Sequence, residues 1–222
     1  MLALITAILC GCQTIENQAP TQTLVRVIDA SYSAPSVDVK VGTTEIAADI
    51  GAGTFTNYAF LLPENATAYV YPAKTATATA EAQGTFEVAQ QHSVFITDSA
   101  GIYGAAILAD QAVAAPSGFF SIRFLQQASK AGAVDIYLVP STATLAGTKA
   151  LFSDVKPQAV EGYVNVPTGM YTLVVTPAGV VTTPYTSAPL TFADGQVRTA
   201  LIMDAQLTTN PPVNVVIGND VE

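Results

Sequence analysis

A long internal repeat is the feature that most constrains how this chain folds. The stretch Val25–Val39, VRVIDASYSAPSVDV, returns 97 residues later, without a gap, as Ile122–Ile136, IRFLQQASKAGAVDI. Two charged positions keep this spacing, and the pairs are Arg26 with Arg123 and Asp38 with Asp135. Self-similarity at a fixed spacing predicts two copies of one structural unit along the chain.

Two later segments extend the repeat. Phe86–Asp98, FEVAQQHSVFITD, resembles Leu190–Asp204, LTFADGQVRTALIMD, once two residues of gap are allowed. The stretch AAILAD, which ends at Asp110, resembles VVIGND, which ends at Asp220. Alanine, proline and glycine between the copies favour a loop there. We therefore predict a first module at 24–113, a linker at 114–118 and a second module at 119–222.

Apolar residues inside each copy recur with a period of two, as β-strands require. Val37, Val39 and Val41 fall on one face of a pleat, and Asp38 and Lys40 fall on the other. Hydrophobic residues make up 50% of the chain and charged ones only 11%, which suits short strands joined by tight turns. With about seven strands in roughly 90 residues, the pattern predicts an all-β protein of two tandem immunoglobulin-like antiparallel β-sandwiches.

The chain begins with MLALITAILCGCQ, an apolar run too short to span a bilayer but typical of a secretion signal. Leu9–Cys12, LCGC, resembles the bacterial lipobox, in which the cysteine is diacylated and becomes the mature N-terminus. The basic residues that usually precede such a run are absent, because the first Lys or Arg is Arg26. We expect a signal peptide at 1–11, lipidation at Cys12 and a tether at 12–23; a buried N-terminal helix or strand is the alternative.

The repeated charges form the first candidate site. If their strands pair, Arg26 with Asp38, and Arg123 with Asp135, project from the same outer face. One interpretation is a binding patch present twice. The other is a cross-strand ion pair that contributes about 0.2–1 kcal/mol.

Tyr69 and Tyr71 form the second candidate site, because residues two apart on a strand share a face. Two such rings make a flat platform on which a protein partner or a glycan can stack, or they pack within the strand face. The chain has no Trp, which counts against a carbohydrate module.

The sequence has few residues of the types that form catalytic triads, metal sites or cofactor-binding loops. His92 is the only histidine; we expect it to be a solvated residue at a strand end, with adjacent Ser93 on the opposite strand face. Both cysteines precede residue 13, and no phosphate-binding or calcium-binding loop motif occurs, so we expect no metal and no cofactor. A net charge of −9 argues against nucleic acid as a partner.

The stretch Val25–Val39 is similar to the hallmark of a bacterial secreted family, the domain of unknown function 4397. That hallmark reads roughly V-R-V-x-H-A-S-x-x-A-P-x-V-D-V and often occurs in tandem copies. Pro167–Leu173, PTGMYTL, likewise resembles the family's P-x-G-x-Y-x-V segment. Asp29 stands where the family usually carries His, and Gln126 stands there in the second copy. The resemblance implies export, a β-sandwich and no known activity.

These features together favour a non-enzymatic binding or structural module, anchored by lipid in a bacterial envelope, with the outer membrane favoured. We expect a protein partner that contacts strand edges or loops, and contact with the membrane only through the lipid anchor. A glycan-binding accessory module is the alternative. A hydrolase is a second alternative, because the 17 carboxylates include pairs that only the fold can bring together.

Overall fold

The computed structural model describes residues 21–32, 35–99, 101–182, 185–205 and 212–221, and this part of the chain is almost entirely β-structure. The first half contains β1 (Thr23–Ala30), β2 (Val37–Val41), β3 (Thr44–Ile50), β4 (Thr54–Phe55), β5 (Ala59–Leu61), β6 (Glu64–Pro72), β7 (Ala80–Phe86), β8 (Gln91–Ser99) and β9 (Ile102–Asp110). The second half contains β10 (Phe119–Gln127), β11 (Val134–Pro140), the 3-10 turn η1 (Leu145–Gly147), β12 (Phe152–Val155), β13 (Val164–Pro167), β14 (Gly169–Pro177), β15 (Tyr185–Thr186), β16 (Leu190–Phe192), β17 (Val197–Asp204) and β18 (Val213–Val221). The predicted all-β class is confirmed.

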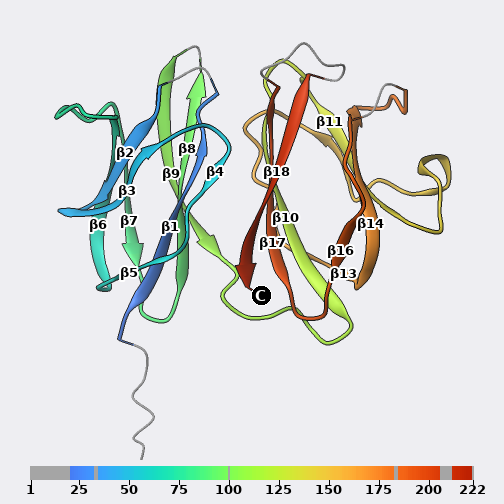
Figure 1. Cartoon of the computed structure of the whole chain (residues 1–222), viewed down its shortest axis with the longest axis horizontal. Coiled ribbons are helices and arrows are strands. Elements are labelled where there is room, and N and C mark those ends of the chain that lie inside the picture. Colours follow the sequence, from blue (N-terminus) through green and yellow to red (C-terminus); the bar gives the residue numbers. More distant parts are fainter. Residues whose placement is uncertain (1–20, 33–34, 100, 183–184, 206–211, 222) are drawn as a thin grey trace, which may run out of the picture.

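The strands form four sheets that stack as layers (Figure 1). We name the sheets A to D by the strands given below; sheets A and C are the inner layers, and sheets B and D are the outer layers beside A and C, respectively. Sheet A has the strand order β4-β1-β8-β9, with β5 also on β1, and sheet C has the matching order β13-β10-β17-β18. Sheet B has the order β3-β2-β6-β7, and sheet D has β12-β11-β14-β15, with β16 also on β14. Strand pairing is antiparallel except for β1 with β8 and β10 with β17, which run parallel. The same exception in both halves means that the two share one topology.

Each half is a sandwich with its own apolar core. The alternation of β2 is borne out, because Val37, Val39 and Val41 are fully buried while Asp38 and Lys40 are only partly so. Between sheets A and B the core also takes side chains from β1, β6 and β8. Between sheets C and D it includes the stacked rings of Phe120 and Phe192, whose centroids lie 4.1 Å apart. Valine and isoleucine suit these inward positions because branched side chains pack well on a pleated surface.

A third apolar cluster joins the two halves, because sheet A packs face to face on sheet C. Its buried members come from both halves: Ile28, Ala30, Phe95, Leu125, Leu201 and Met203. At Gly218 on β18 an added Cβ would lie 2.2 Å from the ring of Phe55, so the sheets meet too closely here for any side chain. Strands β1 and β10 are therefore buried on both faces.

The segment between the halves is held against the second half. Ala115 N–H donates to the carbonyl of Gly195 at 2.9 Å, and Ser121 Oγ donates to Gln111 Oε1 at 2.9 Å. Gly118 has φ +85°, which glycine adopts without strain. The module boundaries themselves stay a prediction.

The start of the chain lies outside the described residues up to residue 20, so the signal peptide at 1–11, Cys12 and most of the tether remain predictions. Within the described residues, no helix is both long and apolar enough to cross a bilayer.

Candidate functional site

Arg26 and Arg123 occupy equivalent places at the centre of the contact between sheets A and C. Their side chains are only 1% and 3% exposed. Arg26 Nε donates to Ser93 Oγ at 2.9 Å, and Arg123 Nε donates to Thr199 Oγ1 at the same distance. Each guanidinium also donates across the interface to a backbone carbonyl on the last strand of the other half, Asn219 at 2.8 Å and Ala109 at 3.1 Å. Each arginine thus spans from its own half into the other.

Two buried aspartates complete the arrangement by exchange between the halves. Arg26 pairs with Asp220 at the end of β18, and Arg123 pairs with Asp110 at the end of β9. The second oxygen of Asp110 accepts from Ser93 at 2.6 Å. The second oxygen of Asp220 accepts in the same way from Thr199, also at 2.6 Å. We call Arg26, Arg123, Asp110, Asp220, Ser93 and Thr199 the exchange network. Each charged side chain in it is paired with an opposite charge and hydrogen-bonded to at least one hydroxyl.

Two partly buried tyrosines, Tyr58 and Tyr163, lie over the arginines of the exchange network and donate hydrogen bonds to its aspartates. Tyr58 Oη donates to Asp110 at 2.6 Å, and Tyr163 Oη donates to Asp220 at 2.7 Å. The ring of Tyr58 lies 4.7 Å from the Arg26 guanidinium, and the ring of Tyr163 lies 4.8 Å from that of Arg123, which is cation–π distance. Burial raises the pKa of both phenols, and Asp110 raises that of Tyr58 further, so both stay protonated donors.

Burial lowers the pKa of Arg26, but Asp220 and Asp110 raise it more, so the net pKa shift is upward. The Arg26 guanidinium therefore stays charged, and the geometry of the ion pairs has to offset the cost of removing the charges from water.

The predicted pairing of Arg26 with Asp38, and of Arg123 with Asp135, on an outer face is wrong. The alternation rule places Arg26 on the opposite face from Val25 correctly, but that face is covered by the other half. Asp38 and Asp135 lie instead on the outer faces of sheets B and D.

The two repeated aspartates have equivalent structural roles. Asp38 accepts the backbone N–H groups of Asp49 at 2.8 Å and Lys74 at 3.0 Å. Asp135 does the same in the second half, and its partners are Asp154 and Gly179, both at 2.8 Å. All four donor residues have positive φ, so each carboxylate holds two tight turns beside its strand; three of the donors are not glycine and store strain there.

Asp29 and Gln126, which replace the family's histidine, lie at the far ends of β1 and β10. Gln126 Oε1 accepts from Ala128 N–H, and its Nε2 donates to the carbonyl of Gly132 at 2.8 Å. Asp29 Oδ1 accepts from Ser31 in the matching way, but its Oδ2 is buried and has no hydrogen-bond partner within the described part of the chain. Burial raises the pKa of Asp29; the bonds from Ser31 lower it and nearby Asp98 raises it, and the net shift is upward. A protonated Asp29 would copy the donor that the Gln126 amide provides.

His92 is buried rather than solvated, which corrects the prediction from sequence. Its Nδ1 lies 3.3 Å from Thr23 Oγ1, and its ring meets Phe86 edge-on with centroids 5.3 Å apart. Burial lowers the pKa of His92, which favours the neutral ring. Ser93 lies on the opposite face of β8, as predicted, and belongs to the exchange network.

The outer face of sheet B carries the tyrosine pair. Tyr69 and Tyr71 project from β6 and are half-buried, with ring centroids 6.4 Å apart and planes tilted by 45°. Lys40 lies beside them on β2, and its Nζ is 5.7 Å from the Tyr71 ring. Glu81 on β7 is the register partner of Tyr69 on the other side and is exposed. We call these four residues the tyrosine face.

The equivalent face of sheet D is covered by its own chain. Tyr137 stands in the second copy where Lys40 stands in the first, and it packs with Val174 on the neighbouring strand. Leu145 and Ala150, from the segment around η1, lie on this pair and leave Tyr137 7% exposed. The two halves share a scaffold but only the first leaves its outer aromatic residues accessible.

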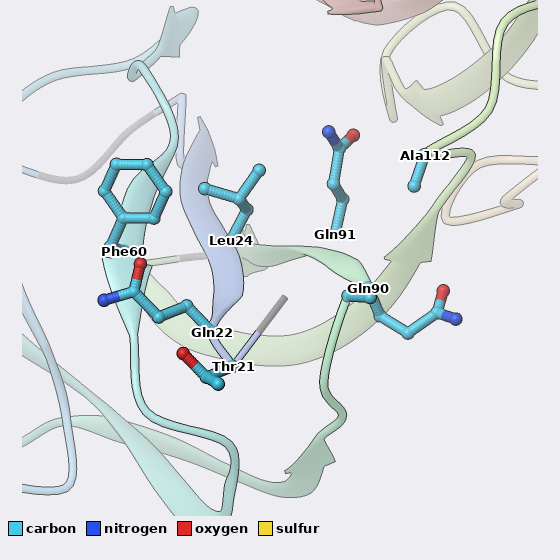
Figure 2. A pocket seen from close by; sticks show the side chains of 8 residues that line it. Thr21, Gln22, Leu24, Phe60, Gln90, Gln91 and Ala112 are labelled. Atoms are coloured by element: carbon cyan, nitrogen blue, oxygen red, sulfur yellow. The ribbon is translucent and has the colours of Figure 1, made fainter. Parts of the chain in front are cut away.

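A shallow pocket lies where the chain leads into β1 (Figure 2). It has a volume of about 290 Å³, and Thr21, Leu24, Phe60, Gln91 and Ala112 are among the residues that line it. The described residues that line it include no charged side chain and no histidine, so they offer no group for acid–base catalysis. Across the described part of the chain, no group of three or more His, Cys, Asp or Glu side chains is placed to hold a metal ion.

The partners of the repeated arginines were not predictable from the sequence. Asp110 and Asp220 were visible only as the shared ends of the repeat, which was the one available signal. Tyr58 and Tyr163 gave none, because they lie outside the matched stretches.

The exchange network predicts a large, coupled loss of stability on mutation. Replacing Arg26 by Ala, or Asp220 by Ala, should lower the free energy of unfolding by about 3–5 kcal/mol, because each change leaves one uncompensated buried charge in the network. The double variant should lose clearly less than the sum of the two. Urea unfolding followed by circular dichroism measures all three variants.

Lys156→Ala is the matched control, because its ion pair with Asp154 is exposed. It should change the free energy of unfolding by no more than about 0.5 kcal/mol. Arg26→Ala and Lys156→Ala variants of equal stability would contradict a central role for the exchange network.

The raised pKa of Asp29 predicts that the difference in stability between the wild type and an Asp29→Asn variant depends on pH. A pKa raised in the folded state means that the folded chain binds the proton more tightly, so stability present below pH about 4 is lost as pH rises through the folded pKa. Asp29→Asn removes this dependence and provides the amide donor. Its melting temperature should exceed that of the wild type by about 3 °C or more at pH 8, with a smaller difference at pH 4.

Differential scanning calorimetry across this pH range measures the comparison, with Asp98→Asn and Tyr103→Phe as controls for the two titratable groups near Asp29. A difference that stays constant from pH 4 to pH 8 would show that Asp29 does not titrate there.

Comparison with known proteins identifies the family. A crystal structure from Bacteroides ovatus, described as that of a "putative cell adhesion protein", is 11% identical, with 91% of this chain and 98% of that chain covered and a TM-score of 0.27. A likeness this low carries no argument about function. No curated protein matches the chain. Residues 23–137, just over half of the chain, match the family described as domain of unknown function (DUF4397). The chain therefore belongs to the DUF4397 family.

Proposed function

We propose that this protein is a non-enzymatic binding module of a bacterial cell envelope, anchored by lipid at Cys12, and that it binds a protein partner on the tyrosine face. The observation that carries the proposal is the difference between the halves. The same outer face is covered by the segment around η1 in the second half and open in the first. We further propose that the halves are tandem copies of one module.

The rest of the surface supports this choice of face. Sheets A and C have no free face, because one face of each packs in its own sandwich and the other face packs on the other half. Among the edge strands of the outer sheets, β3 is interrupted by two register shifts and β12 has only four residues, whereas β7 has seven residues and pairs only with β6. Binding through strand edges, one of the two modes expected from sequence, therefore has a long edge at β7, but the accessible aromatic residues lie on the sheet face.

The chemistry of the tyrosine face suits a protein partner. Tyrosine supplies a large contact area with few rotatable bonds, and it is enriched among residues that dominate binding energy. Lys40 and Glu81 flank Tyr69 with opposite charges in one cross-strand row. Opposite charges around an aromatic centre give orientation and specificity to a protein contact.

A glycan is the second candidate ligand, and one observation favours it. The rings of Tyr69 and Tyr71 lie side by side on a sheet face, half-exposed, where the apolar face of a sugar ring can stack. The tilt of 45° between the rings makes the platform less flat than stacking on an extended polysaccharide requires. We therefore rank the protein partner first.

The tyrosine face predicts a loss of partner capture. The double change Tyr69→Ala and Tyr71→Ala should weaken capture of the partner from envelope extracts by at least about tenfold, because two aromatic anchors are removed. The control is Val180→Ala with Val181→Ala, which truncates exposed apolar side chains in the second half. Affinity capture with quantitative mass spectrometry measures both.

The same experiment separates the two ligand classes. An amine crosslink from Lys40 to a peptide identifies a protein, whereas capture that periodate treatment abolishes identifies a glycan. Equal capture by the tyrosine and valine variants would place the binding surface elsewhere.

The anchor makes a separate prediction. In a bacterial host, the mature protein should begin at Cys12 and carry a diacylglyceryl group, and Cys12→Ser should release it from the membrane fraction. Intact-mass spectrometry and cell fractionation measure these outcomes. A wild-type protein that keeps residues 1–11 and carries no lipid would contradict the anchor.

A further inference from the structure

The end of the molecule where Thr21 leads into β1 exposes large apolar side chains. Phe60 and Leu62, at the end of β5, are 70% and 71% exposed. Phe60 is the register partner of Leu24 on β1, so it lies beside the point where the chain enters the fold. Figure 2 shows Phe60, Leu24 and Thr21 around the shallow pocket here. We call this end the base.

Other exposed apolar side chains gather at the base because of the strand directions. Strands β1, β8 and β10 begin at this end, and β9 and β18 finish here (Figure 1). The turn before β8, the segment after β9 and the starts of β10 and β14 therefore lie at the base, and they carry Val88, Val113, Phe119 and Met170, all exposed. Of the residues that the structure describes, the exposed apolar side chains of this size outside the base are fewer: Ile102, Val160, Val180 and Val181. Both exposed phenylalanines among the described residues are at the base.

The base has no basic side chain. The segments that form it, 21–24, 59–64, 86–91, 110–120, 166–170 and 193–196, contain no Lys or Arg. Their acids are Glu64, Glu87 and Asp194, which are exposed, and Asp110, which is buried in the exchange network. An apolar surface without basic residues suits the uncharged interface of a zwitterionic bilayer and offers nothing for attraction to anionic lipids.

We infer that the base rests on the bilayer and inserts Phe60 and Leu62 among the lipid headgroups. This inference depends on the proposed lipid anchor at Cys12. Thr21 follows Cys12 by nine residues, which reach at most about 30 Å when fully extended. The anchor therefore holds the base close to the membrane surface, where exposed aromatic and aliphatic side chains lower their free energy by entering the interface.

Single tryptophan reporters test the inference, because the chain has no Trp of its own. Lipidated Phe60→Trp protein is reconstituted into phosphatidylcholine vesicles, with and without bromine on the acyl chains, which quenches nearby fluorescence. The matched control is Ile102→Trp, which is 74% exposed in wild type and lies at the opposite end of the molecule. Phe60→Trp should lose roughly half of its emission or more in brominated vesicles and shift to shorter wavelength, and Ile102→Trp should do neither.

The outcomes separate this inference from the anchor. If Cys12 is acylated and the two reporters behave alike, the base does not contact lipid, although the anchor stands. If the protein from the bacterial host carries no lipid, does not float with vesicles and shows no quenching, both the lipid anchor and the contact of the base with the bilayer are wrong. A shift of the Phe60→Trp spectrum that depends on protein concentration and needs no vesicles would assign the base to a second copy of this chain and overturn the inference.

Discussion

The reciprocal exchange of two ion pairs between the halves is the interaction on which the rest of the structure depends. Arg26 and Arg123 are removed from water at a high cost, and the nearest carboxylate of each belongs to the other half, although Asp110 also lies 3.5 Å from Arg26 Nε within the first half. Only the assembled pair of sandwiches compensates both charges, so the halves must meet in one geometry. The cluster of apolar residues around the network adds affinity without direction, whereas the crossed pairs fix the register of sheet A on sheet C. The two halves therefore form one four-layer body instead of two modules joined by a flexible linker.

This constraint changes what the repeat means for function. The charged positions that repeat serve the scaffold, since the arginines join the halves and Asp38 and Asp135 hold pairs of turns with positive φ. A role specific to one surface must then arise where the halves differ. Lys40 against Tyr137 is such a difference, because the first leaves a sheet face open and the second lies under the chain around η1.

The sequence predicted the strands and the equivalence of the halves, because alternation and repeat spacing are local properties. The valines of β2 were placed correctly for this reason. It did not predict the partners of Arg26, because alternation assigns a residue to a face but does not say what covers that face. Asp220 is 194 residues away from Arg26, and no local pattern links them. His92 was misplaced on similar grounds, since its position at the end of a strand suggested solvent, but Thr23 and Phe86 enclose it.

A single open face per chain also limits how the protein can bind strongly. Two identical faces held rigidly by one body would raise affinity for a repeated ligand through effective concentration. The second half covers its equivalent face, so in the proposed function one chain contributes one contact and the second half serves as a support. Any gain from multiple contacts would then have to come from several chains. The proposed lipid anchor and tether would favour this, because they would restrict each chain to a thin layer and raise the local concentration of tyrosine faces.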